Sequence, residues 1–329
     1  MNVSSVDRNV SPDETMPLRR RLLELELGEM RLRARQLAAG FQMGLHLSQK
    51  RGPGMEFLGH RAYSPGDDLR HLDRRALLRH RRYLLREFHV DTERPLHLIV
   101  DFSSSMNFAD DSPASGEPSA TRPLSKAGFA RLMAAALAMI RGRAGDPVGL
   151  SLLHGLAEPQ RLPDFLPPRG GSEQLERILA QLESDRGRSE NGPRVSPQEV
   201  LLETANRLPP RSTVLWLSDF IDEDTDYQAV FPMVSSKSRT LVAVQILTVA
   251  ERTFPYQGPL VLSDPESNLR IETDGSRGRA EYLAALGAHN RALEEALLAA
   301  SSTFLSVTPS ESPRNLLRSI AEATGARSR

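Results

Sequence analysis

The chain has 329 residues, 42 basic and 42 acidic side chains, and no cysteine. A net charge of zero gives no overall electrostatic reason to expect nucleic acid or an anionic membrane as a partner. The lack of cysteine excludes disulfides and thiolate metal sites. We find no signal sequence and no apolar stretch long enough to span a bilayer. The sequence therefore predicts a soluble, cytoplasmic protein without a transmembrane segment.

The first part of the chain is predicted to contribute little regular structure. Residues 1–16 are polar and are expected to form a disordered tail. The stretch 18–36 is rich in Arg, Leu and Glu, as is typical of an exposed amphipathic helix. The glycine-bearing stretch 40–73 is predicted to be irregular. We therefore expect an N-terminal helix and irregular arm over 17–95, followed by the main domain over 96–329.

The main domain alternates apolar strands with helices. Strands are predicted at residues 96–100, 147–153, 214–217, 241–247 and 303–307. Helices are predicted to begin after Ser125 and to cover 172–182, 196–208, 279–300 and 313–323, with Ser125 and Ser196 as N-caps. Continuous apolar strands separated by helices are typical of the α/β class. They predict a doubly wound, mostly parallel sheet covered on both faces.

The segment from His97 to Met106 carries the most chemical information. Its apolar strand ends at Asp101, and two hydroxyls follow at alternate positions, Ser103 and Ser105. Mg²⁺ prefers oxygen ligands, few of them charged, and keeps positions open for water or an incoming carboxylate. The pattern therefore indicates a site for a hard divalent cation. It contains no strong nucleophile.

A second dense segment lies upstream and includes the stretch from Arg61 to Asp73. Together the two segments resemble the domain of unknown function 58 family, bacterial proteins often encoded beside MoxR-type AAA+ ATPases. The residues that fit the family pattern are Ser48, Gly52, Gly54, Glu56, Phe57, Arg61, Tyr63, Pro65, Gly66, Asp67, Asp68, Arg70, Asp73, Asp101, Ser103, Ser105, Met106, Ser218, Asp219 and Phe220. Arg74 replaces the family's usual tryptophan, and Leu72 its isoleucine. Such proteins look like von Willebrand factor A domains, which implies a Rossmann-type sheet with a metal-ion-dependent adhesion site.

The resemblance implies a ligand set for Mg²⁺ or another divalent cation. Its members are Asp101, Ser103, Ser105, Ser196 and Asp219. Ser196 stands where such sites usually have a threonine, and Ser172 is the second candidate for that place. The alternative is that Asp101 and Ser105 only cap backbone amides and that no metal binds. The sequence leaves open whether the metal binds to the chain alone or only together with a partner.

The upstream motif surrounds a predicted type II turn at Pro65 and Gly66. Its residues are Glu56, Arg61, Tyr63, Pro65, Gly66, Asp67, Asp68, Arg70 and Asp73. These residues would form either a docking loop for a partner or an internal lattice of salt bridges. The basic stretch 70–86 has a single aromatic residue, Tyr83, which favours a solvated face or an acidic protein partner over nucleic acid.

The favoured function is a non-enzymatic, metal-dependent interaction module. The resemblance implies that it works with a MoxR-type AAA+ ATPase in the assembly, maturation or stress response of client proteins. The chain itself has no Gly-x4-Gly-Lys-Ser/Thr motif for a nucleotide. The alternative is a Mg²⁺-dependent phosphohydrolase with Asp101 as its nucleophile. Such an enzyme needs a second carboxylate two residues later, and Ser103 stands there instead.

Overall fold

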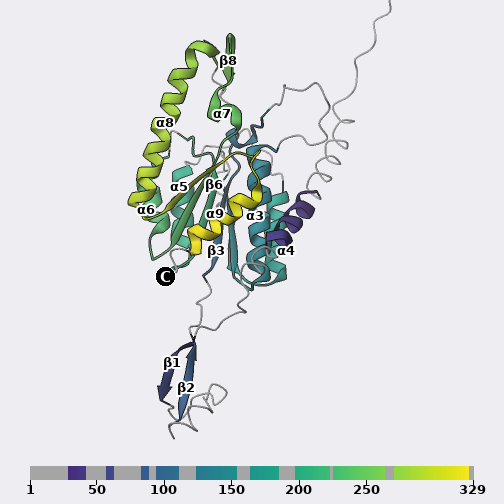
Figure 1. Cartoon of the computed structure of the whole chain (residues 1–329), viewed down its shortest axis with the longest axis vertical. Helices are drawn as coiled ribbons and strands as arrows, with labels where there is room; N and C mark the ends of the chain where they lie inside the picture. The colour runs from purple at the N-terminus through teal and green to yellow at the C-terminus, as the bar shows by residue number, and fades with distance from the viewer. Residues whose placement is uncertain are drawn as a thin grey trace, which may run out of the picture. The chain divides into compact units, whose positions relative to one another are not determined.

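The computed structural model describes residues 29–41, 57–62, 83–88, 94–110, 124–153, 164–184, 197–222, 225–263 and 270–325 (Figure 1). Contacts along the backbone divide them into two units. The larger unit contains residues 29–41 and 94–325, and the smaller one lies within 42–93. Each unit is described by itself.

The smaller unit contains a two-stranded antiparallel sheet. Strand β1 (Phe57–Ala62) pairs with β2 (Leu84–Phe88), and the register is irregular at the start of β1. The prediction of an irregular stretch over 40–73 is therefore wrong for β1. Sequence reasoning misses this strand because Gly59 and Arg61 interrupt the apolar alternation that indicates a strand.

The larger unit is built around a six-stranded sheet of order β10-β7-β6-β3-β4-β5. The strands are β3 (Leu96–Asp101), β4 (Val148–Leu153), β5 (Asp164–Arg169), β6 (Thr213–Ser218), β7 (Thr240–Ile246) and β10 (Thr303–Val307). Every neighbouring pair is parallel except β4 and β5. The chain winds outward from β3 in one direction and from β6 in the other. This order is that of a doubly wound α/β sheet, so the predicted fold class is confirmed.

Helices cover both faces of this sheet (Figure 1). One face packs against α3 (Lys126–Arg143), α4 (Ser172–Glu183), α9 (Pro313–Gly325) and the helix over 29–41. The other face packs against α5 (Pro197–Arg207), α6 (Tyr227–Ser235) and α8 (Gly275–Ala299). Alternation along the strands separates the two cores: Leu98 and Val100 join the first, and Ile99 joins the second.

The helix over 29–41 is less exposed than the sequence predicts. Met30, Ala34 and Ala38 recur at four-residue spacing and are all buried in the first core. The Arg31 side chain forms ion pairs with Glu176 and Glu183 on α4. The predicted amphipathic helix is therefore present in its described residues, and its apolar face is buried because small alanines let it lie close to its neighbours.

Several elements of the larger unit are absent from the sequence prediction. They are β5, α6, the short helix α7 (Val249–Thr253) and the antiparallel hairpin of β8 (Pro259–Ser263) and β9 (Arg270–Asp274). Prolines hide two of them: Pro167 and Pro168 lie in the edge strand β5, and Pro232 lies inside α6. In the described part of the chain, we find no helix of the length and apolarity needed to cross a membrane.

Candidate functional site

The candidate site lies where β3 and β6 end side by side. Asp101 is the last residue of β3, and Asp219 follows the last residue of β6. The Ser218 hydroxyl donates a hydrogen bond of 2.6 Å to Oδ2 of Asp101 and so joins the two strand ends. The strand order reverses between β3 and β6, which is where doubly wound sheets bind their ligands.

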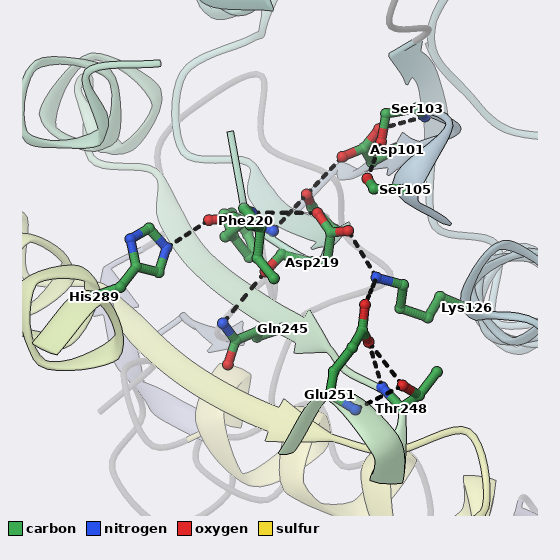
Figure 2. Close-up of polar contacts among 12 residues, drawn as sticks. Asp101, Ser103, Ser105, Lys126, Asp219, Phe220, Gln245, Thr248, Glu251 and His289 are labelled. Carbon is green, nitrogen blue, oxygen red and sulfur yellow. Dashed lines mark hydrogen bonds and ion pairs between the residues drawn. The ribbon is translucent and has the colours of Figure 1, made fainter. Parts of the chain in front are cut away.

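The loop after β3 brings two hydroxyls next to Asp101. The Ser103 amide donates to Oδ1 of Asp101 at 2.8 Å, which folds the loop back over the carboxylate. The Ser103 and Ser105 hydroxyl oxygens are 3.0 Å apart (Figure 2). A short 3-10 turn, η2 (Ser105–Asn107), follows and buries Met106 in the first core. The apolar anchor at Met106 fixes the loop, and the three oxygen-bearing side chains share one spot.

The carboxylate of Asp101 carries charge that the protein compensates only partly. Burial, and then the nearby charge of Asp219, raise the pKa of Asp101 from 3.8 to about 7. The hydrogen bonds from Ser218 and Ser103 act in the opposite direction. Among the described residues, no basic side chain forms an ion pair with Asp101. A bound cation would supply the missing compensation.

Asp219 faces a lysine that sequence reasoning did not find. The Lys126 ammonium lies 2.8 Å from Oδ2 of Asp219 and 2.6 Å from Oε1 of Glu251 (Figure 2). The Lys126 side chain is 0% exposed, and that of Asp219 is 3% exposed. Burial alone would lower the pKa of Lys126, but the charges of Asp219 and Glu251 raise it above its ordinary value. The lysine is therefore held protonated inside the site.

Glu251 belongs to the N-terminus of α7. Its Oε2 accepts from the backbone amide of Thr248 at 2.7 Å, while the Thr248 hydroxyl accepts from the Glu251 amide. This reciprocal pair is a capping box, and its Thr-x-x-Glu spacing could have been recognised in the sequence. Asp110 fixes the same turn, because its two carboxylate oxygens accept from the amides of Val249 and Ala250, each at 2.9 Å.

The turn after β6 has an unusual backbone that neighbouring side chains stabilise. Phe220 adopts a left-handed conformation with a φ of 55°. Its amide donates to the Ser218 hydroxyl at 3.0 Å, and its carbonyl contacts Nε2 of His289 at 2.7 Å. Gln245 donates to the Asp219 carbonyl at 3.3 Å (Figure 2). These bonds from three separate elements over-determine the direction in which the Asp219 side chain points.

The oxygen atoms of the site fit a small hard cation. Two ligands at about 2.0–2.1 Å from Mg²⁺ in neighbouring octahedral positions lie about 3 Å apart. The Ser103 and Ser105 oxygens have this separation, 3.0 Å, although it also suits a simple hydrogen bond between them. Such a site depends on hydroxyls, because across the described segments no three His, Cys, Asp or Glu side chains are grouped to hold a metal.

Of the two candidates for the remaining hydroxyl, one lies at the other end of the sheet and the other is outside the described residues. Ser172 begins α4 just after β5, and Arg169 at the end of β5 pairs with Val148 at the start of β4. Asp101 instead pairs with Leu153 at the end of β4. Ser172 therefore lies at the opposite end of the strands, near the start of β4, and is wrong as a candidate ligand. Ser196 lies outside the described residues.

The upstream motif lies almost wholly outside the described residues. Arg61 belongs to β1 in the smaller unit, where only the backbone is described. The other members are outside the described part of the chain: Glu56, Tyr63, Pro65, Gly66, Asp67, Asp68, Arg70 and Asp73. Its two interpretations, a docking loop and a salt-bridge lattice, both stay predictions.

Several solved structures are similar to this chain. One is an aerotolerance-related membrane protein from Bacteroides fragilis, with a TM-score of 0.44 at 14% identity over 71% of this chain and 99% of that chain. A second is BatB from Bacteroides thetaiotaomicron, with a TM-score of 0.41 at 12% identity over 70% of this chain and 99% of that chain. A third is a membrane spanning protein from Vibrio fischeri, with a TM-score of 0.23 at 16% identity over 70% of this chain and 96% of that chain.

The names of two of these structures bear on where the protein is found. The Bacteroides fragilis and Vibrio fischeri proteins are both named as membrane proteins. These names contradict the cytoplasmic location predicted from the sequence, and we withdraw that prediction. It had relied on the absence of an apolar spanning segment, which is too little to establish a location.

Curated relatives come from mycobacteria. Uncharacterized proteins from Mycobacterium tuberculosis and Mycobacterium bovis are each 25% identical to the chain over 248 residues, which is 75% of this chain and 72% of theirs. The model of the family described as "Protein of unknown function DUF58" matches residues 59–292, more than half of the chain. This match contains both strand ends of the site. The chain therefore belongs to the DUF58 family of proteins of unknown function.

Proposed function

We propose that this chain is a non-enzymatic interaction module that recognises a partner protein through a bound divalent cation, Mg²⁺ or one of similar chemistry. The carrying observation is the convergence of the two strand ends, with the Ser218 hydroxyl 2.6 Å from Asp101 and the Ser103 and Ser105 oxygens 3.0 Å apart. Asp101, Ser103 and Ser105 would hold the metal, with Asp219 and Ser196 as the other members of the predicted set. When bound, such a cation supplies an open position for a carboxylate.

The charges of the site support a cation and do not suit a nucleophile. The Lys126 ammonium pairs with the carboxylates of Asp219 and Glu251, and among the described residues no basic side chain pairs with Asp101. A phosphohydrolase with Asp101 as nucleophile would need an acid two residues later, and Ser103 has no titratable group near neutral pH. We therefore propose that the chain has no catalytic activity of its own.

The proposed partner is a MoxR-type AAA+ ATPase, acting with this chain on client proteins in assembly, maturation or stress response. Three exposed apolar residues near the site could contact such a partner: Phe108, Ile221 and Val249 are each 43% exposed. Each is tied to the site by its backbone. The Phe108 carbonyl accepts from the Lys126 amide at 3.0 Å, and the Ile221 and Val249 amides bond to Asp219 and Asp110. Exposed apolar residues of this kind can supply the area that a partner buries.

The test is a calorimetric titration of the full chain with the MoxR-type ATPase encoded nearby, with Mg²⁺ and with EDTA. We expect binding in Mg²⁺ that EDTA removes, and a loss of at least tenfold in affinity for Asp101→Ala combined with Ser103→Ala. Glu294→Gln on the exposed surface of α8 is the matched control and should bind as the wild type does. Equal binding under all these conditions would exclude the metal edge as the docking surface. No binding between folded proteins would exclude the ATPase as a direct partner.

A further inference from the structure

The position of Lys126 is unfavourable unless the residue has a specific task. It is the first residue of α3, where the helix dipole disfavours a positive charge. Its side chain is also fully removed from solvent, and burial disfavours an ammonium a second time. The four residues that follow Lys126 in α3 are apolar or small, so an apolar residue would suit this turn better. Two carboxylates offset these penalties, and both belong to the edge where the candidate site lies.

The two aspartates of the site have different surroundings. Oδ2 of Asp219 accepts a hydrogen bond from the Lys126 ammonium, and Oδ1 accepts one of 3.3 Å from the Ile221 amide. Asp101 accepts from neutral donors, the Ser103 amide and the Ser218 hydroxyl. One aspartate thus has a cation as its partner already, and the other has only hydrogen bonds. A metal entering the site meets much stronger competition at Asp219 than at Asp101.

We propose that Lys126 is a built-in cation that holds Asp219 as its own counter-ion and leaves the exchangeable metal to Asp101, Ser103 and Ser105. This inference rests on the proposed function and corrects the predicted ligand set, because Asp219 becomes a positioning residue and not a ligand. Glu251 keeps the lysine in place from the other side, at 2.6 Å, and is itself fixed by the capping box of α7. The ammonium is therefore held by two carboxylates from different elements.

The consequence is a metal site with one formal negative charge among its ligands. The affinity of an oxygen site for a divalent cation increases with the number of charged ligands. A single carboxylate with two hydroxyls therefore binds Mg²⁺ weakly, and a partner's carboxylate adds the second charge. Lys126 thus makes metal binding depend on the partner, because it withholds the carboxylate that would otherwise complete the site.

The test measures Mg²⁺ binding by the full chain alone, by calorimetry and by the melting temperature as a function of Mg²⁺ concentration. Asp219→Asn keeps the shape of the side chain and should change the Mg²⁺ affinity by less than about threefold. Asp101→Asn should weaken it by at least about tenfold. Lys126→Met should strengthen it by about tenfold, because Asp219 becomes available as a ligand. Mg²⁺ should also raise the melting temperature of Lys126→Met more than that of the wild type.

Glu251→Gln is the matched control. It removes one charge next to Lys126 but leaves the pair with Asp219, so the melting temperature should decrease while the Mg²⁺ affinity stays within about threefold. The inference is overturned if Asp219→Asn loses Mg²⁺ binding as completely as Asp101→Asn, and this comparison decides the matter alone if Lys126→Met does not fold. Failure of wild type and Lys126→Met to bind millimolar Mg²⁺ would overturn the metal and the inference together. The expected metal pattern without ATPase binding would remove only the proposed partner.

Discussion

In the described part of the chain, the amino and carboxyl ends of the large sheet each contain one buried Lys or Arg side chain, and the charges of the two are compensated in different ways. Arg239 lies just before β7, at the amino end of the parallel strands. Its guanidinium donates hydrogen bonds of 2.8–3.3 Å to the carbonyls of Leu208, Pro209, Met233 and Val234. These carbonyls end α5 and α6, where the helix dipole is negative. At the carboxyl end, Lys126 contacts two carboxylates. The arginine is neutralised by dipoles and the lysine by full charges.

Under the proposed function, this difference separates stability from binding. Backbone carbonyls do not titrate and cannot dissociate, so the hydrogen bonds of Arg239 are a fixed part of the amino end of the sheet. At the other end of the sheet, the Lys126 ammonium pairs with Asp219 and Glu251 but not with Asp101. Burial, and then the charge of Asp219, raise the pKa of Asp101 to about 7. An end of the sheet with uncompensated negative charge can bind and release a cation, whereas an end whose charge is compensated only holds the helices together. The following predictions test this contrast, from the largest expected effect to the smallest.

Replacing Lys126 by methionine should give the largest loss of stability. The change leaves Asp219 and Glu251 without their counter-ion, and breaking a buried pair in this way costs about 3–5 kcal/mol. Urea unfolding in the presence of a chelator measures it. Lys237→Met makes the same chemical change at an exposed position and should stay within about 0.5 kcal/mol of the wild type. A loss below 1 kcal/mol for Lys126→Met would mean that the ion pairs contribute little.

Replacing Arg239 by methionine should destabilise the protein by about 3 kcal/mol, because four carbonyls lose a charged donor. Unlike Lys126→Met, it should not be stabilised further by Mg²⁺ when the urea titrations are repeated with Mg²⁺ in place of the chelator, since no carboxylate is released. Arg177→Met on the exposed side of α4 is the control and should have almost no effect. Rescue of Arg239→Met by Mg²⁺ would contradict the separation of the two ends.

The amino half of the sheet should also make stability depend on pH. Burial, then the charges of Arg239 and Arg207, lower the pKa of His97 from 6.5 to about 3. Between pH 6.5 and 3, His97 is therefore protonated in the unfolded chain but neutral in the folded chain. This contribution is complete above pH 6.5 and is lost as the pH decreases toward 3. Between pH 7 and 5 it amounts to about 2 kcal/mol.

The comparison of wild type with His97→Gln isolates this effect, since glutamine can still bond to the Ser151 hydroxyl, which lies 2.8 Å from Nε2 of His97. Unfolding free energies at pH 7, 6 and 5 should show a shallower decrease for His97→Gln. Parallel curves for the two proteins would show that His97 titrates normally in the folded state.

Replacing Asp110 by asparagine should have the smallest effect, about 0.5 kcal/mol, because an amide oxygen can replace only one of its two acceptors. Hydrogen exchange should become faster at the Val249 and Ala250 amides, which Asp110 accepts from. Amides in β6 should be unchanged and serve as the internal reference. Unchanged exchange at both α7 amides would show that Asp110 does not hold this helix.

The predictable part of the site is the part written in consecutive residues. Asp101, Ser103 and Ser105 form a local pattern at a strand end, and Ser218 with Asp219 ends another apolar strand. The order of the strands made these ends neighbours, as a doubly wound sheet implies. The prediction for Ser172 failed because the sequence did not reveal strand β5. This strand runs antiparallel to β4 and returns the chain to the amino end of the parallel strands before α4 begins.

The charge network could not be predicted, because its pairs are distant in sequence. Lys126 meets Asp219 and Glu251 across 93 and 125 residues, and no local pattern specifies such contacts. One cue existed: a lysine directly after the N-cap, at the start of an apolar first turn, contradicts both the dipole and the burial expected there. Such a local conflict is a common sign of a functional position.

The two prolines of β5 have a consequence for the behaviour of the protein at high concentration. An open edge of a sheet offers its amide groups to the next chain and can start aggregation. Pro167 and Pro168 lie in the edge strand β5 and carry no amide hydrogen. The strand therefore offers an incomplete template for intermolecular pairing, and this edge resists the growth of amyloid-like assemblies.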